Sequence, residues 1–153
     1  GRVAPAPGDR VTAPTATAVR ACSMAELQSF GLLPKMARTM IECARRVNRL
    51  NALADEPLDD LVRKLQVIRG VGPWTAGQVA GFRLGRSDAI ILGDLGLPHS
   101  VAYTLEGKPK SDDGEMLELL EPFRPHRFRI VRLIMHAGQS PPRRAPRGDL
   151  WSR

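Results

Sequence analysis

The sequence predicts an all-α fold in which a short hairpin joins two helices. The chain has 153 residues, of which 42% are hydrophobic, enough for one domain with a buried core. Apolar residues recur at helical spacing in several stretches, and none alternates between apolar and polar residues as a half-buried strand does. Residues 69–73, Arg-Gly-Val-Gly-Pro, separate two of these stretches. We therefore expect a helical bundle with a helix-hairpin-helix motif.

The first half of the chain contains four predicted helices. They are expected at residues 16–21, 24–30, from Pro34 onwards, and 58–68, with a linker at 51–57. Ser23 and Glu26 form a capping-box pattern at the start of the second helix. The third has an amphipathic pattern, and its predicted apolar face consists of Met36, Met40, Ile41, Ala44 and Val47.

Four more helices are predicted after the hairpin. They are expected at residues 74–84, from Asp94 to 105, at 112–120 and at 127–137. The last two have apolar stripes that consist of Met116, Leu119 and Leu120, and of Ile130, Leu133, Ile134 and Ala137. Gly77 and Gly81, four residues apart, permit close helix packing or leave room for a bulky group nearby. The resulting domain is expected at 24–138, after a Pro- and Ala-rich arm and linker at 1–23.

The charge of the chain favours a polyanionic partner without proving one. The formal net charge is +7, which is typical of proteins that bind nucleic acid but also serves simple solubility. Residues 139–153 hold four Arg and one Asp, so this segment carries +3 and the remaining chain +4. We expect this basic segment to be an extended, solvated tail.

Cysteine and histidine usage argues against a metal cofactor. The two cysteines, Cys22 and Cys43, are too few for a disulfide framework or an iron–sulfur cluster. Cys43 lies on the apolar side of a predicted helix and is expected to be buried. The three histidines lack metal-ligand spacing. With no apolar run of membrane-spanning length and no apolar centre in the first twenty residues, the expected location is the cytoplasm, without membrane contact.

The hairpin has the chemistry of a phosphate-binding turn. Gly70 and Gly72 permit backbone conformations and close approaches that other residues resist. Pro73 suits the first turn of a helix, where its missing N–H costs nothing. The following helix would then present its first backbone amides to an anion.

Residues 68–76 (Ile-Arg-Gly-Val-Gly-Pro-Trp-Thr-Ala) and 93–97 (Gly-Asp-Leu-Gly-Leu) resemble the helix-hairpin-helix DNA glycosylase superfamily. Within it, the sequence is most similar to the bacterial 3-methyladenine DNA glycosylase II group, and the resemblance covers residues 24–138. It implies a monomeric base-excision repair enzyme of the bacterial nucleoid that acts on double-stranded DNA. It also implies that the hairpin holds the DNA backbone through Arg69, Gly70, Val71, Gly72 and Thr75, with a possible monovalent cation at its carbonyls.

By the same resemblance, Asp94 is the catalytic residue. The superfamily hydrolyses the N-glycosidic bond of a nucleotide that has been flipped out of the duplex. A carboxylate near the sugar stabilises the positive charge that develops there and orients the attacking water. The alternative is an ordinary helix N-cap, and the two roles are compatible.

Trp74 occupies the position at which strand-nicking members of the superfamily carry a nucleophilic lysine. The resemblance therefore implies hydrolysis without a Schiff base. It also implies that the indole forms a wall of the base pocket and stacks on cationic alkylated purines such as 3-methyladenine or 7-methylguanine. The alternative for Trp74 is a core anchor. His126 and Phe123 are expected near the pocket, where the family pattern has a Trp in place of His126; a surface position at a helix start is the alternative for His126.

The family has a Gln-rich segment that carries a wedge for the gap left by the flipped base, and the sequence before residue 24 has no counterpart. We therefore expect an incomplete member, and two alternatives remain open. One is a helix-hairpin-helix module that binds DNA without catalysis. The other is a different base specificity, such as mispaired adenine or uracil.

Overall fold

A computed structural model of the chain describes residues 12–137 and 141. The start of the predicted arm and almost all of the predicted basic tail lie outside the described residues. The chain divides into two compact units, Gly1–Ala76 and Gly77–Arg153. Throughout the described ranges the regular structure is helical and contains no strand, so the predicted all-α class is confirmed.

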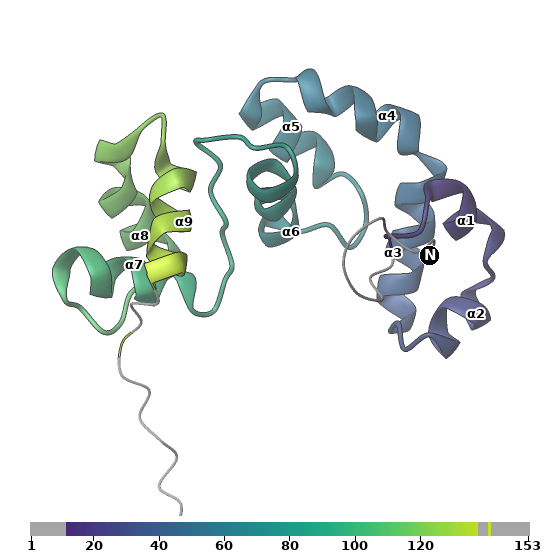
Figure 1. Ribbon diagram of the computed structural model, residues 1–153, viewed down its shortest axis with the longest axis horizontal. Coiled ribbons are helices and arrows are strands. Elements are labelled where there is room, and N and C mark those ends of the chain that lie inside the picture. Colours follow the sequence, from purple (N-terminus) through teal and green to yellow (C-terminus); the bar gives the residue numbers. More distant parts are fainter. Residues whose placement is uncertain (1–11, 138–140, 142–153) are drawn as a thin grey trace, which may run out of the picture. The chain divides into compact units, whose positions relative to one another are not determined.

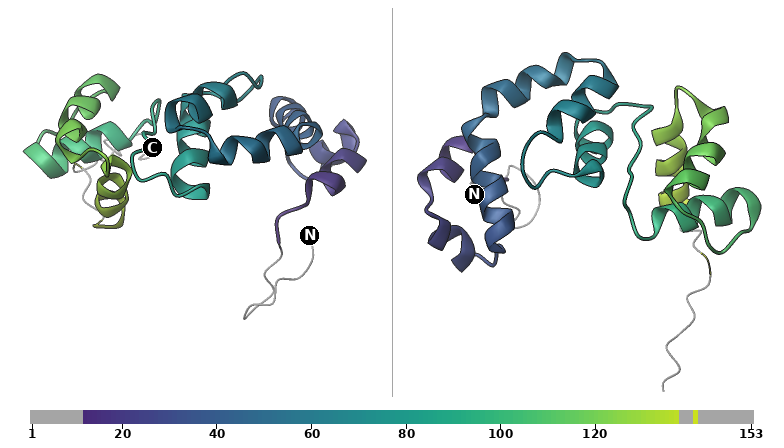
Figure 2. Two further views of the ribbon diagram at one scale, coloured as in Figure 1. Left: turned by 90° about the horizontal axis from the view of Figure 1, so that it is seen from above. Right: turned by 180° about the vertical axis from the view of Figure 1, so that it is seen from behind.

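The first unit is built on α3 (Figure 1). Its elements are α1 (Ala16–Ala21), α2 (Met24–Ser29), α3 (Pro34–Arg45), α4 (Val47–Ala52), the 3-10 turn η1 (Leu53–Asp55) and α5 (Leu58–Leu65), and α6 (Pro73–Gln78) begins in it. Both α1 and α2 pack on α3, as the views in Figure 2 also show. Buried side chains from these elements and from the turn after α5 form the core, namely Val19, Leu27, Ala37, Ala44, Leu53, Leu61, Leu65 and Ile68.

Local sequence signals set the starts of the early helices. Thr15 caps α1 by accepting a hydrogen bond from the Ala18 amide. The predicted capping box is confirmed, because the Ser23 hydroxyl accepts from the Glu26 amide and the Glu26 carboxylate accepts from the Ser23 amide. Each satisfies an amide that helix formation leaves without a partner.

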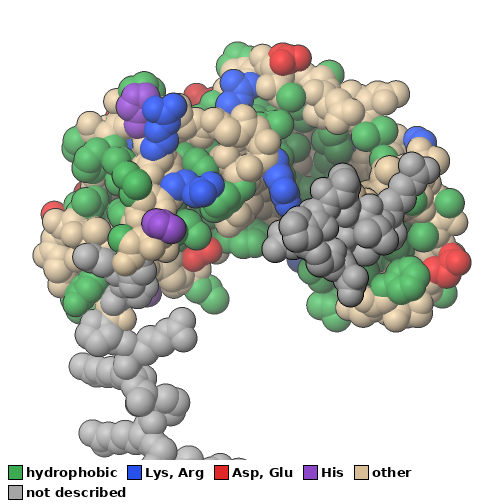
Figure 3. Space-filling view, in the orientation of Figure 1, with side chains coloured by type: hydrophobic (Ala, Val, Ile, Leu, Met, Phe, Trp, Pro, Cys, Tyr) green, Lys and Arg blue, Asp and Glu red, His purple; other side chains and the backbone are tan. Residues whose placement is uncertain are grey.

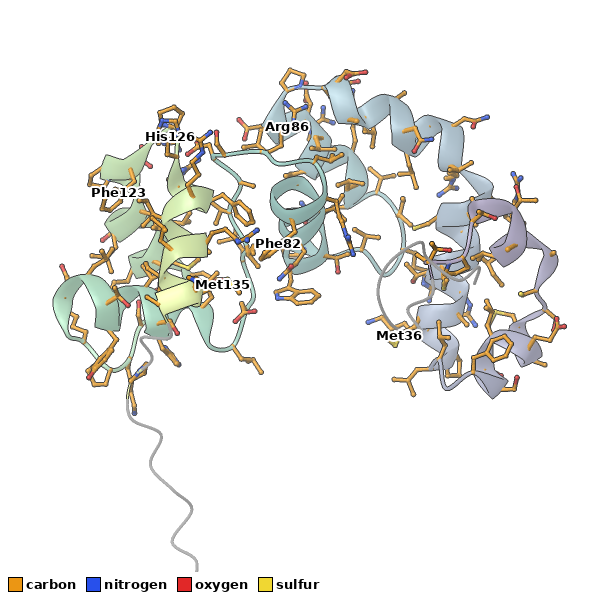
Figure 4. All side chains as sticks on the ribbon, viewed as in Figure 1. Met36, Phe82, Arg86, Phe123, His126 and Met135 are labelled. Carbon is orange, nitrogen blue, oxygen red and sulfur yellow. The ribbon has the colours of Figure 1, made fainter. Side chains whose placement is uncertain are left out.

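The predicted apolar face of α3 is only partly correct. Ala44 is buried, but Met36 is 58% exposed (Figure 4), so its place in the apolar face was wrong. Met36 lies in the first turn of α3, where the helices that pack on α3 leave its side chain exposed. Cys43 is half-buried rather than buried, and this burial raises the pKa of its thiol.

The predicted linker at residues 51–57 is largely helical. The backbone breaks at Arg46, whose φ is −106°, and α4 and η1 then continue to Asp55. The helix Leu58–Leu65 also ends earlier than predicted, although Ile68 is buried in the turn that follows. Burial of Leu53 in the core explains why this segment folds despite its weak helical pattern.

The second unit packs three helices together. They are α7 (Leu97–Glu106), α8 (Asp113–Leu120) and α9 (Arg127–Ala137), with the 3-10 turn η3 (Glu121–Phe123) between the last two. Helix α7 packs on both α8 and α9 (Figure 1). The most deeply buried side chains of this core are Ile91, Val101, Met116, Leu120 and Val131. Leu133 was predicted in the apolar stripe of α9 but is 65% exposed, so this assignment was wrong.

The helix predicted at residues 74–84 changes type along its length. It is α-helical in α6 and then π-helical over Val79–Arg83 (η2), where the Leu84 amide donates to the Val79 carbonyl at 3.1 Å. Gly77 and Gly81 both lie in close contacts: Gly81 leaves room for the bulky Phe128 ring of α9, as one of the two expectations had it, whereas Gly77 packs on a non-helical segment rather than on a helix. A Cβ on Gly77 would fall on the backbone of Ile90 and Ile91, and a Cβ on Gly81 would fall on the Phe128 ring.

Aromatic contacts join η2 to α9 in the second unit. The rings of Phe82 and Phe128 meet edge to face with centroids 5.0 Å apart, and the Arg132 guanidinium lies 5.0 Å from the Phe82 centroid. These contacts fasten η2 to α9.

Within the described part of the chain, none of the helices combines the length and the apolarity needed to cross a membrane.

Candidate functional site

The predicted hairpin is a tight turn between α5 and α6. The Val71 amide donates to the Ile68 carbonyl at 2.9 Å, and the Ala76 amide donates to the Gly72 carbonyl at 3.0 Å as the helix begins. Pro73 is the first residue of α6, as predicted. The backbone at Gly70 has φ +95°, which is why a glycine is required there.

Helix α3 holds this hairpin from one side. The Thr39 hydroxyl lies 3.0 Å from the carbonyl oxygen of Arg69, 30 residues away in sequence. A Cβ on Gly70 would fall on the Thr39 side chain. Thr39 was not identified in the sequence, where nothing distinguishes it from a surface helix residue.

Trp74 is the second residue of α6 and is 45% exposed. A core anchor would be covered by surrounding side chains, so this exposure argues against that alternative. The neighbouring Thr75 is half-buried and Ala76 is fully buried. The first turn of α6 thus buries its smaller residues and leaves the Trp74 indole exposed to solvent.

Asp94 lies immediately before α7 and is held by backbone amides. Its Oδ1 accepts hydrogen bonds from the amides of Gly96 and Leu97, both at 2.9 Å. The N-cap of α7 is Gly96 rather than Asp94, so the helix begins two residues later than predicted. The capping function predicted for the Asp94 side chain is nevertheless present, since it satisfies the first amides of the helix.

The loop that carries Asp94 is also tied to α8. Gly93 has φ +75°, and its amide donates to the Asp113 carboxylate at 2.7 Å. Asp113 is the first residue of α8. Sequence reasoning missed this tether, although two consecutive aspartates at a helix start were a visible signal. The residue that follows Asp94 is Leu95, whose apolar side chain is 95% exposed to solvent.

A buried ion pair fixes the start of α9. The Arg127 side chain is 8% exposed, and its guanidinium donates to both carboxylate oxygens of Asp88, at 2.8 and 2.6 Å. The Arg127 hydrogen bonds hold the pKa of Asp88 below its usual range. Sequence reasoning missed both residues because a carboxylate and a guanidinium 39 positions apart give no periodic signal.

Phe123 and His126 lie at the same end of the second unit, on either side of the turn between η3 and α9 (Figure 4). The His126 amide donates to the Phe123 carbonyl at 2.7 Å. Phe123 is half-buried, whereas His126 is exposed at the start of the helix. These positions agree with the surface alternative for His126 and leave pocket contact as a prediction.

The predicted site residues therefore fall into two sets. The first unit holds the hairpin, Trp74 and Thr75, and the second holds Asp94, Phe123 and His126. Each set is organised by contacts within its own unit. Where the structure describes the chain, no three His, Cys, Asp or Glu side chains gather as metal ligands would.

No family model matches the chain. Over 78 residues, half of the chain, the sequence is 37% identical to the Putative DNA-3-methyladenine glycosylase YfjP of Bacillus subtilis. The resemblance to DNA glycosylases is confirmed. This matched stretch amounts to 26% of the relative, so the chain spans about a quarter of that protein.

A solved structure agrees on the fold. The crystal structure of DNA-3-methyladenine glycosidase from Bacillus halodurans matches 80% of this chain and 58% of its own, with a TM-score of 0.68 and 21% sequence identity. The all-α glycosylase fold predicted from the hairpin motif is therefore present.

Proposed function

We propose that this chain belongs to a monofunctional DNA glycosylase that removes alkylated purines, of the 3-methyladenine or 7-methylguanine type, from double-stranded DNA. In this reaction water attacks the anomeric carbon of the flipped nucleotide. The N-glycosidic bond breaks, the base leaves with the bonding electrons, and a proton from water passes to the solvent or the departing base. An alkylated purine carries a positive charge and leaves readily, so little acid catalysis is needed.

The observation that carries the proposal is the anchored carboxylate of Asp94. Two amides at 2.9 Å fix its orientation, and the Gly93–Asp113 contact fixes the backbone beside it. A carboxylate held in this way can stabilise an oxocarbenium ion without reorganising during the reaction. The names of the two similar proteins, both 3-methyladenine enzymes, support the substrate class.

The exposed indole of Trp74 supports the choice of a cationic base. A Trp face binds a cation more strongly than other aromatic rings. A tryptophan also has no amine with which to form a Schiff base, so free base should be released without strand cleavage. Electrophoresis of the DNA product, before and after alkaline treatment, distinguishes an abasic site from a nicked strand.

The central test replaces Asp94 with Asn. The amide oxygen can still accept the two backbone hydrogen bonds, so the loop keeps its geometry while the negative charge is lost. We expect release of free base from methylated duplex DNA to fall by about a hundredfold or more, with DNA binding retained. Asp55→Asn, an exposed change of equal charge, is the control. Full activity of Asp94→Asn would exclude the proposed role.

A second candidate function is DNA binding without catalysis. One observation favours it: the hairpin lies in a compact unit that does not contain Asp94. This function predicts salt-dependent binding of duplex DNA by the wild-type chain and no abasic product from methylated DNA.

The hairpin also fits the monovalent cation that the resemblance implies. The carbonyls of Ile68, Arg69 and Gly72 have protein donors, whereas those of Gly70 and Val71 accept no hydrogen bond from a described residue. These two oxygens are suitable ligands for such an ion, which would supply positive charge beside a bound phosphate.

A further inference from the structure

A cationic depression lies beside the hairpin in the first unit. Its volume is about 270 Å³, and it is lined by Lys35, Arg38, Thr39, Arg69 and Gly70. It exists because the hairpin lies directly against α3, where Thr39 meets the Arg69 carbonyl and Gly70 has no Cβ to obstruct the contact. Two cations from one helix and one from the hairpin therefore share a single concave surface.

Several cations of the first unit form ion pairs within it, whereas the three that line the depression have no carboxylate partner among the described residues. In the same unit Arg46 pairs with Glu42 at 2.6 Å, Lys64 with Glu56 at 2.5 Å, and Arg63 with Asp60 at 2.5 Å. Among the described residues, none is an ion-pair partner of the three cations that line the depression.

Three positive charges around one hollow, without an ion-pair partner among the described residues, favour an anion from outside the protein. Lys35 and Arg38 are three residues apart on α3 and so lie on one face of the helix. Within the first unit, on the face shown in Figure 3, the Lys and Arg side chains are separated by hydrophobic and uncharged atoms. Affinity for a polyanion should therefore come from local clusters such as this one.

We propose that Lys35, Arg38 and Arg69 bind a phosphate of the DNA backbone next to the phosphate held by the hairpin amides. This inference rests on the DNA binding included in the proposed function. Successive phosphates of one strand lie side by side along the duplex, so a site adjoining the hairpin meets the next phosphate of the same strand. Lys and Arg contacts to phosphate carry no sequence information, which suits an enzyme whose selectivity resides in the base pocket.

The test is the salt dependence of binding to undamaged duplex DNA. We compare wild type with Lys35→Gln/Arg38→Gln and with the control Arg45→Gln/Arg49→Gln, which removes the same charge from exposed positions outside the depression. Fluorescence anisotropy between about 50 and 200 mM salt gives the slope of log K against log salt concentration. Loss of one phosphate contact lowers this slope by about one, and we expect that change in the first variant alone.

Equal slopes for the two double variants would overturn the inference. So would saturable binding of inorganic phosphate that disappears in Lys35→Gln/Arg38→Gln while the DNA slope stays unchanged, because the site would then serve a free anion. Circular dichroism verifies that both variants are folded.

Base release separates this inference from the proposed function. If the slope falls as expected but wild type releases no base, the phosphate site stands and the hydrolase function fails. If wild type releases base and the slope does not fall, only the phosphate site fails.

Discussion

At the residue scale, glycine positions decide how the candidate site is assembled. Gly70 and Gly31 both have positive φ, at +95° and +87°, but only Gly70 also lies against another side chain. A Cβ there would fall on Thr39, whereas a Cβ on Gly31 would meet open space. The same substitution made at the two positions therefore separates the cost of backbone strain from the cost of steric overlap within one unit.

We expect Gly70→Ala to destabilise the chain more than Gly31→Ala. Both variants place alanine in the left-handed region, which costs about 1 kcal/mol. Gly70→Ala adds an overlap that moves the hairpin away from α3, with a total cost of about 2–4 kcal/mol. Urea denaturation followed by circular dichroism measures the difference, and equal costs would contradict the close approach.

At the element scale, the Asp88–Arg127 pair joins the connection before α7 to the first turn of α9. Removing one partner of a buried pair leaves the other charge without compensation. Asp88→Ala should therefore destabilise the second unit by about 3 kcal/mol. Asp60→Ala, which removes an exposed pair within α5, should change stability little and serves as the control.

The same pair predicts how stability depends on pH. Because the folded pKa of Asp88 is lowered, the unfolded chain binds this proton more readily than the folded one. The contribution of the pair is therefore complete above the unfolded pKa of about 3.9 and is lost as the pH falls through the folded value. Thermal unfolding from pH 7 to pH 3 should show a smaller loss of stability in Asp88→Ala than in wild type.

Sequence patterns predicted elements well where a cap or a helical period was strong, as at 24–30, 112–120 and 127–137. They failed where tertiary packing decided the outcome. The segment at 51–57 has weak helical periodicity, and it folds because Leu53 is buried. The exposure of Met36 and Leu133 could not be read from their own helices, since it depends on which neighbours cover each face.

The site was predictable to the extent that its residues are close in sequence. The turn within Ile68–Ala76 and the amide contacts of Asp94 both form between residues that are close in sequence, so both were recognisable from short motifs. Thr39 and Asp113 contact partners that are 30 and 20 residues away in sequence, and only the fold reveals these contacts. Such contacts depend on the packing of α3 and α8, which no local pattern encodes.

At the scale of the whole molecule, the proposed DNA contacts and the proposed catalytic group belong to different units. Binding and chemistry should therefore respond differently to DNA concentration. For Lys35→Gln/Arg38→Gln, base release should be slow at low DNA concentration and approach the wild-type rate at saturation. For Asp94→Asn, it should stay slow at every DNA concentration. Single-turnover rates measured over a range of methylated DNA concentrations test this difference, and a rate defect in the first variant that persists at saturation would argue against it.

The π-helical turn η2 has a consequence for comparing this chain with its relatives. A π-helical turn accommodates one more residue than an α-helical turn over the same length of backbone. A relative in which this segment is α-helical should therefore be one residue shorter between Val79 and Arg83, and its alignment with this chain should need a single gap there. Without that gap, every residue before the turn would be aligned with the wrong residue of the relative. The packing of Gly77 on Ile90 would then be assigned to a different position.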